Sequence, residues 1–435
     1  MSDSKVTLDS KLTVVSSRPV KSGVNHRLSG VDHGMGYHTL HLIFYYKNEG
    51  KWFESFELDP LRESLSEVLS IYPTVTGRLG RVKEDGGDWE VRCNDAGVRV
   101  IKANVDSTIE KWLSSSAGGS DEVQLIAWDD MPLDTSTWSP FRIQINSFKE
   151  GGIAIGVSCT HMISDLTFLS SFFKSWSQIH RHVIPISQPP FYTPISISSL
   201  PNNNNNMSPN SGPKPQTNIT SATFKFSSSI IKQLTSKCSG ATAFDVLAAL
   251  FWTRVTLLKD SKQNHSLSIC QDFRKLIKPN LPVGYFGNAL HFSKFSLNFD
   301  ETKNGKKLED IASLIHMHMN DVTEKEIWSS IESFESQKDS TPRCVYGSSE
   351  LTCVCMEEEE TEGLLYESMF GDNEKPAHVS CRVGNVGGEG LIMVMPSSEG
   401  GFARNVIVML QNEEVDKLCE DEEILKLEPT IILSG

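Results

Sequence analysis

The stretch GGIAIGVSCTHMISDLTFLSSFFKSW, residues 151–176, joins an apolar strand pattern to a helix pattern across a short polar turn. Alternate apolar residues from Ile153 to Cys159 predict a buried strand. His161 follows this strand, and Asp165 opens an apolar stretch with helical spacing. The pattern predicts a strand that delivers an imidazole to its tip, with a carboxylate one turn further on. This is a common way to hold a general base in a cleft.

Both polar residues of this turn have an alternative interpretation. Of the twelve histidines, His161 is the one with Asp at the fourth position after it, and such a match arises easily by chance. His161 therefore fits either a functional base or a core histidine that is hydrogen-bonded at a strand end. Asp165 fits either a helix N-cap or a group of an active site.

Length and composition narrow the class of protein. The chain has 435 residues, more than one ordinary hydrophobic core organises, so we expect two domains. Its hydrophobic content of 38% and charged content of 22% predict a soluble globular protein. The formal net charge of -14 argues against nucleic acid or an anionic membrane as the main partner.

Cysteine usage and hydropathy predict a cytoplasmic protein. The nine cysteines are odd in number and form no C-x-x-C pair, which indicates reduced thiols. The first residues, MSDSKVTLDSKLTVV, lack the apolar core of a signal peptide. The sequence contains no apolar run of about 18 residues, so we expect no transmembrane segment.

A polar stretch divides the chain near its middle. Residues 198–217, SSLPNNNNNMSPNSGPKPQT, contain almost no large apolar side chains and predict a linker without a core. We therefore expect an N-terminal domain at 1–195, a flexible linker at 196–220 and a C-terminal domain at 221–435.

Each half mixes strand and helix patterns, so the expected class is α/β. The strands expected are 40–46, 89–93, 98–101, 153–159, 222–226, 351–356, 378–382, 390–395 and 405–410. The helices expected begin at Asp59, at Asp165, at Ala241 and at Glu413. Glycines crowd between the strands at 378–382 and 390–395, which predicts a hairpin there. Two such halves predict a cleft between domains, where small-molecule sites concentrate.

Several motifs together resemble the BAHD acyltransferase family of plants. They are the H-x-x-x-D tetrad at 161–165, FDVLAALFW at 244–252, Asp272-Phe-Arg274, and GYFGN at 284–288. The resemblance covers nearly the whole chain, and the last two motifs are its most specific part. It implies two domains of the chloramphenicol-acetyltransferase type with mixed sheets. It also implies an interdomain channel from which the histidine is reached from both sides.

The resemblance also implies a chemistry for the site. His161 is then the general base in the transfer of an acyl group from acyl-CoA to a hydroxyl or amine acceptor. Asp165 orients the turn, and Arg274 is its ionic partner across the fold. Acyl-CoA is a co-substrate, no cofactor is bound, and the protein is a monomer.

One family signature is eroded in this chain. Where the family reads D-F-G-W-G, the sequence has Met369, Phe370, Gly371, Asp372 and Asn373. Phe370 and Gly371 survive, whereas Met369 and Asp372 replace the Asp and the Trp. The family loop shapes the second domain and in some members helps near the oxyanion, and the erosion argues against both roles here.

Such erosion is also a feature of the Eceriferum and Glossy wax proteins, a subgroup of this family. The chain resembles them at 92–97, 102–105, 390–394 and 402–404. This favours an alternative, a non-catalytic protein that assists very-long-chain fatty acid elongation through an elongase condensing enzyme. Association with the endoplasmic reticulum through that partner would follow. A third hypothesis is an acyl- or CoA-binding protein with a dead site.

Two histidine pairs have spacings that metal ligands use. His38 and His41 are three residues apart, and His316 and His318 are two apart. No matching Cys or carboxylate pair stands close to either, so we expect no metal site.

Overall fold

The fold is given by a computed structural model. It describes residues 5–21, 23–53, 59–82, 88–114, 121–195, 218–238, 240–259, 265–297, 307–338, 343–357 and 359–432. Residues 196–217 of the predicted linker lie outside this set. Strand β9 (Ile219–Phe226) begins two residues before the expected start of the second domain at 221.

A six-stranded mixed sheet, in the order β1-β6-β7-β8-β3-β13, contains five strands of the first half and β13, which comes from the range 221–435 expected to form the C-terminal domain. Its strands are β1 (Val6–Val14), β6 (Val98–Val105), β7 (Phe141–Phe148), β8 (Ile153–Thr160), β3 (Thr39–Tyr46) and β13 (His378–Gly384). Strands β6 and β7 are parallel, and the other neighbours are antiparallel. A small sheet at the edge contains β2 (Asn25–Arg27), β5 (Trp89–Arg92) and β4 (Arg78–Arg81).

A seven-stranded mixed sheet organises the second half, in the order β11-β10-β12-β14-β15-β9-β16. Its other strands are β11 (Leu290–Leu297), β10 (His265–Asp272), β12 (Leu351–Cys355), β14 (Leu391–Pro396), β15 (Arg404–Gln411) and β16 (Thr430–Ile432). Strands β10, β12 and β14 are parallel to one another. The predicted α/β class with two mixed sheets is confirmed.

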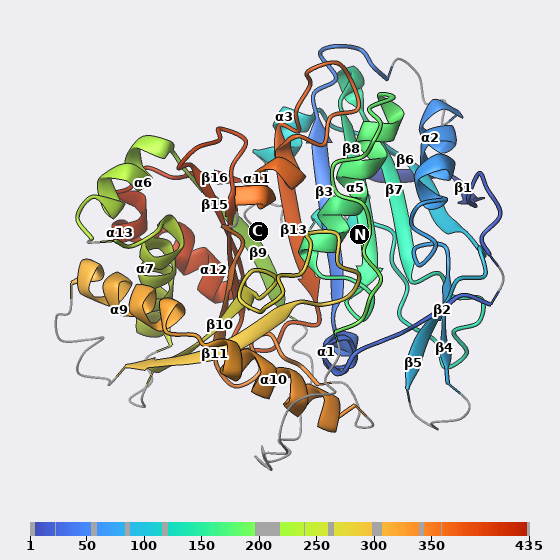
Figure 1. The fold of residues 1–435 in the computed structure, drawn as a ribbon. Coiled ribbons are helices and arrows are strands. Elements are labelled where there is room, and N and C mark those ends of the chain that lie inside the picture. Colours follow the sequence, from blue (N-terminus) through green and yellow to red (C-terminus); the bar gives the residue numbers. More distant parts are fainter. Residues whose placement is uncertain are drawn as a thin grey trace.

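Helices cover both sheets (Figure 1). The helices of the first half are α1 (Gly30–Gly34), α2 (Asp59–Leu69), α3 (Ile109–Leu113) and α5 (Leu166–His180), with 3-10 turns η1 (Met35–Tyr37), η2 (Glu122–Leu125) and η3 (Lys149–Gly151). Those of the second half are α6 (Ser228–Thr235), α7 (Ala243–Leu258), α9 (Leu308–Asn320), α10 (Glu324–Ser336), α11 (Glu359–Tyr366), α12 (Asn412–Cys419) and α13 (Glu422–Leu425). Among the described residues, none of these helices is long and apolar enough to cross a bilayer.

Helix α5 fixes the position of the turn at 161–165. Asp165 is its N-cap and accepts the backbone N–H of Phe168 at 2.9 Å. Its apolar face packs on the first sheet, where Phe173 stacks on Phe44 of β3 with ring centroids 3.7 Å apart. The strand β8 and the helix α5 are therefore both anchored in the core, and the turn between them has little freedom to move.

The glycine-rich segment after β13 crosses between the two sheets, so the predicted hairpin is wrong. Strand β13 pairs with β3 of the first sheet, whereas β14 pairs with β12 and β15 of the second. Figure 1 shows β13 beside β3 in the middle of the molecule. The turn residues predict a change of direction but carry no information about which sheet each strand joins. The backbone of this segment passes close to the backbone at Gly347, which explains the glycine at 387. A Cβ on Gly387 would lie 2.3 Å from the carbonyl oxygen of Gly347.

Candidate active site

The backbone of His161 is held on both sides by other segments. Its N–H donates to the carbonyl of His38 at 3.0 Å. Its carbonyl accepts from Nδ2 of Asn288 at 2.8 Å. Asn288 is the last residue of the GYFGN motif, so this motif contacts the turn that carries His161. The main chain at the imidazole is thereby fixed by residues from both halves of the sequence.

The imidazole of His161 meets a tyrosine. Its Nε2 lies 3.0 Å from the hydroxyl of Tyr346, and the two rings stack at 5.7 Å with an interplanar angle of 22°. Its Nδ1 is buried and has no hydrogen-bond partner among the described residues. Burial lowers the pKa of His161 to about 4, although nearby main-chain carbonyls and Asp165 act in the opposite direction. The ring is therefore neutral at pH 7.

The ring of His161 is 1% exposed. The expectation that it is reached from both sides of a channel is not met in this structure, because Tyr346 covers Nε2 and the core encloses the rest. Tyr346 itself is 3% exposed. It comes from the segment that precedes β12, 185 residues away in the sequence, and nothing in the local pattern around His161 predicts it.

Asp165 is a structural residue, and the N-cap interpretation is confirmed. Besides capping α5, its two carboxylate oxygens accept from the guanidinium of Arg274 at 2.8 and 3.0 Å. The backbone N–H of Ala289 donates to the same carboxylate at 2.9 Å. The ion pair expected between Asp165 and Arg274 is thus present. It joins the two halves of the chain at the end of the turn 161–165.

Arg274 is buried between two carboxylates. It also pairs with Asp272 at 2.6 Å and donates to the carbonyl of Tyr285 at 3.2 Å. Burial lowers the pKa of Arg274, but Asp165 and Asp272 outweigh it and raise the net value above the ordinary one. Burial raises the pKa of Asp272. The sequence motif Asp272-x-Arg274 therefore encodes a desolvated charge network that links β10 to α5.

A second buried carboxylate, Asp32, was not predicted to belong to the site. It accepts from the backbone N–H and from Nδ2 of Asn288, each at 2.8 Å. Burial raises its pKa to about 6. Gly287 precedes Asn288 with φ +102°, and a Cβ there would lie 2.9 Å from a carboxylate oxygen of Asp32. Gly287 and Asn288 of GYFGN are both explained by this contact with α1.

The histidines considered as metal ligands have other partners. His38 is buried, contacts the carbonyl of Gly384 at 3.0 Å through Nδ1 and accepts the N–H of Val345 at 2.9 Å through Nε2. His41 contacts Ser158 at 2.9 Å and Thr39 at 2.9 Å. The residues that the structure describes include no group of three or more metal-binding side chains.

The eroded loop at 369–373 packs into an aromatic cluster. Phe370 lies 5.0 Å from Trp176 of α5 and stacks on Trp52 at 5.5 Å. A Cβ on Gly371 would lie 2.6 Å from the ring of Trp52. Met369 is half-buried and Asp372 is exposed. These contacts are with the first half of the chain and are structural, so they lend no support to a role near an oxyanion.

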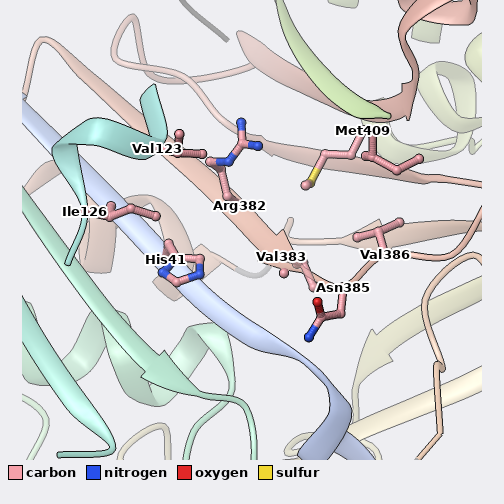
Figure 2. A pocket seen from close by; sticks show the side chains of 10 residues that line it. His41, Val123, Ile126, Arg382, Val383, Asn385, Val386 and Met409 are labelled. Atoms are coloured by element: carbon pink, nitrogen blue, oxygen red, sulfur yellow. The ribbon is translucent and has the colours of Figure 1, made fainter. Parts of the chain in front are cut away.

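Two hollows lie away from His161. One, of about 210 Å³, opens between β3, β13 and η2 and is drawn in Figure 2, where His41, Arg382 and Met409 are among the side chains that line it. The other, of about 390 Å³, lies at the surface between β1 and α2. Neither His161 nor Tyr346 lines either of them.

Comparison with known proteins gives the family. The model of the Transferase family matches residues 4–425. A hydroxycinnamoyltransferase from Narcissus pseudonarcissus is 26% identical over 398 residues, which cover 86% of this chain and 89% of that protein. Protein ECERIFERUM 2 from Arabidopsis thaliana is 25% identical over 441 residues, which cover 97% of this chain and 99% of that protein.

Solved structures of two acyltransferases have the same fold. Vinorine synthase superposes with a TM-score of 0.74 at 19% identity, over 99% of this chain and 100% of that one. The enzyme TRI101 of F. graminearum, complexed with coenzyme A and deoxynivalenol, superposes with a TM-score of 0.71 at 15% identity, over 93% of this chain and 99% of that one. From its sequence match and its fold, the chain belongs to the Transferase family, the BAHD acyltransferases.

Proposed function

We propose that this protein transfers an acyl group from acyl-CoA to a hydroxyl or amine acceptor, with His161 as the general base. The observation that carries the proposal is the 3.0 Å hydrogen bond between Nε2 of His161 and the Tyr346 hydroxyl. An O–H group at this distance from a neutral imidazole is the arrangement that general-base catalysis needs. Family membership supplies the reaction class.

In the proposed reaction the acceptor donates its hydrogen bond to Nε2 and attacks the thioester carbonyl. The proton passes to His161 as the new carbon–oxygen or carbon–nitrogen bond forms. The tetrahedral intermediate then expels the CoA thiolate, which takes the proton back from the imidazolium. No acyl group is attached to the protein, because the thioester is already activated.

The surrounding charges serve to position the base. Asp165, held by Arg274, fixes the start of α5, and Asn288 fixes the carbonyl of His161. Positioning of this kind is a large part of enzymatic rate acceleration. Acyl-CoA as co-substrate is supported by the neighbour TRI101, which was solved with coenzyme A.

The test is the release of free thiol from a panel of acyl-CoAs with alcohol and amine acceptors. His161→Ala should lower the rate by about 10²–10⁴-fold. His182→Ala, at an exposed histidine in the turn after α5, should leave it unchanged. Equal thiol release by the wild type and His161→Ala would refute the base assignment. No release with any pair would refute acyl transfer itself.

A second candidate function is the non-catalytic one, help to a fatty acid elongase through its condensing enzyme. It is favoured by the 1% exposure of His161 and by the match to Protein ECERIFERUM 2 over 97% of this chain. Its test is the rescue of a wax-deficient plant line. Equal rescue by the wild type and by His161→Ala would support this candidate, and failure of both would remove it.

We further propose a cytoplasmic location, with the endoplasmic reticulum reached only through a partner. All nine cysteines are free thiols, as expected in a reducing compartment. Fractionation of cells with and without the condensing enzyme tests this, because recovery in the membrane fraction should depend on the partner.

A further inference from the structure

We propose that Tyr346 closes the acceptor position of the site. The Tyr346 hydroxyl is hydrogen-bonded to Nε2 of His161, where an acceptor must form its own hydrogen bond. An acceptor therefore binds only after it displaces this phenol. The inference rests on the proposed role of His161 as general base. It adds a residue that controls access to that base.

The direction of the hydrogen bond follows from the two nitrogens of the ring. Nε2 lies 3.0 Å from the Tyr346 hydroxyl, whereas Nδ1 has no hydrogen-bond partner among the described residues. We assign the ring proton to Nδ1, the tautomer that a general base at Nε2 requires. Nε2 then carries the lone pair and accepts from the Tyr346 hydroxyl, as it would from an acceptor hydroxyl.

The phenol ring is enclosed by other rings. It lies 4.9 Å from His38 at 72° and 5.5 Å from Phe292 at 66°, in addition to the stack on His161. These contacts hold the tyrosine flat against the imidazole. The hydroxyl has no route to water in this arrangement, so its bond to Nε2 satisfies a buried donor.

The backbone around Tyr346 is fixed on both sides. The N–H of Val345 donates to His38, and the carbonyl of Tyr346 accepts from Gly387 at 2.8 Å. The N–H of Gly347 donates to Thr352 on β12 at 3.0 Å. Because the backbone is fixed, opening of the acceptor position in this proposal is a rotation of the Tyr346 side chain away from Nε2, and it has to break the ring contacts with His38 and Phe292.

A proton relay through the phenol is the main competing role. Burial, and then Cys270 and Asp165, raise the pKa of Tyr346 well above its ordinary value. A phenol that resists ionisation is poorly suited to pass the proton on, which favours a role in access over a role in the proton transfer.

The first test is steady-state kinetics of Tyr346→Phe with the acceptor varied at saturating acyl-CoA. This variant keeps the ring and removes the competing donor, so the KM for the acceptor should fall about fivefold while kcat stays within about twofold. The control is Tyr72→Phe, a buried tyrosine whose hydroxyl contacts Ser175 at 2.9 Å, and its KM should not change. A fall in kcat of about tenfold with KM unchanged would make Tyr346 a relay and overturn the proposal.

The second test needs no turnover, so it separates this inference from the proposed function. Diethyl pyrocarbonate modifies unprotonated histidines, and peptide mass mapping gives the rate at His161. In Tyr346→Ala or Tyr346→Leu this rate should rise at least about tenfold, while the exposed His182 reacts as in the wild type. A rise without thiol release would refute the acyl transfer but keep Tyr346 as the cover of the base. No rise in a variant with wild-type circular dichroism would overturn the cover.

Discussion

The polar network beneath His161 and the aromatic cluster around Phe370 both contain residues of family signatures, yet they differ in what they demand of the sequence. In the network, charged hydrogen bonds join Arg274 to Asp165, and Asn288 donates both to the carboxylate of Asp32 and to the carbonyl of His161. Other residue types cannot reproduce these bonds. In the cluster, Phe370 fills space and Gly371 must lack a Cβ. Packing imposes no such requirement on Met369, which is half-buried, or on Asp372, which is exposed. The residues that survive in the eroded loop are the ones that packing needs. Erosion there leaves the support of His161 untouched.

The largest effect is expected from the network. Arg274→Met should lower the free energy of unfolding by about 3–5 kcal/mol, because it leaves Asp165 and Asp272 buried without their cation. Denaturant unfolding followed by circular dichroism measures this. Arg254→Met, in a more exposed pair with Asp421, is the control and should cost less. An equal loss of unfolding free energy in both variants would mean that the buried network stabilises the fold no more than a more exposed ion pair does.

Phe370→Ala should cost about 3 kcal/mol of unfolding free energy, since it opens a cavity among Trp52, Phe173 and Trp176. The same denaturant experiment applies, with Phe370→Leu as the milder control. Phe370→Ala should leave the site itself intact. Its thiol release per folded molecule should equal that of the wild type, and a selective loss of activity would mean that the cluster acts on the site.

Part of the pH dependence of stability should come from the buried histidines around the site. Burial lowers the pKa of His38 to about 3 and that of His161 to about 4, so the unfolded chain binds protons first as the pH falls. Their contribution is complete above about pH 6.5, the ordinary histidine value, and is lost as the pH falls toward 4.

Unfolding titrations at several pH values test this contribution. His38→Gln should make the slope between pH 6 and 4 shallower by about 1.4 kcal/mol per pH unit, because one proton fewer is bound on unfolding. Phe370→Ala should keep the wild-type slope and merely shift the curve. An unchanged slope in His38→Gln would mean that its ring is not the buried neutral group seen here.

The smallest effect is expected from repair of the eroded signature. Met369→Asp combined with Asp372→Trp restores the Asp and the Trp of the family signature and leaves Asn373 in place of its last Gly, and thiol release should change by less than about twofold. Asp372 is exposed and Met369 is half-buried. Phe370 between them packs on Trp52 and Trp176, whereas His161 contacts Tyr346. A gain of an order of magnitude would show that the loop takes part in catalysis after all.

Much of the site could be predicted from local sequence. The alternation of apolar residues predicted β8, with His161 at its end. The helical spacing that follows predicted α5, and the side chain of Asp165 predicted its N-cap. The motif resemblance added Arg274 as the ionic partner. These features depend on short-range patterns or on motifs that match residue by residue.

Long-range packing could not be predicted in this way. Tyr346 lies 185 residues from His161, and Asn288 lies 256 residues from Asp32, with no periodicity that links either pair. His38 drew attention as a metal ligand because of its spacing from His41, whereas its partners lie at Gly384 and Val345. The sheet that β13 joins could not be predicted for the same reason, because glycines in a turn do not determine which sheet the next strand enters.

The most direct test of the central claim is the pH profile of kcat/KM for thiol release. This quantity reports the pKa of the base in the free enzyme. A buried His161 covered by Tyr346 predicts activity that holds from neutral pH downward and falls with an apparent pKa of about 4. An acid limb near 6.5 would contradict the account, because it would mean that the working imidazole is open to water.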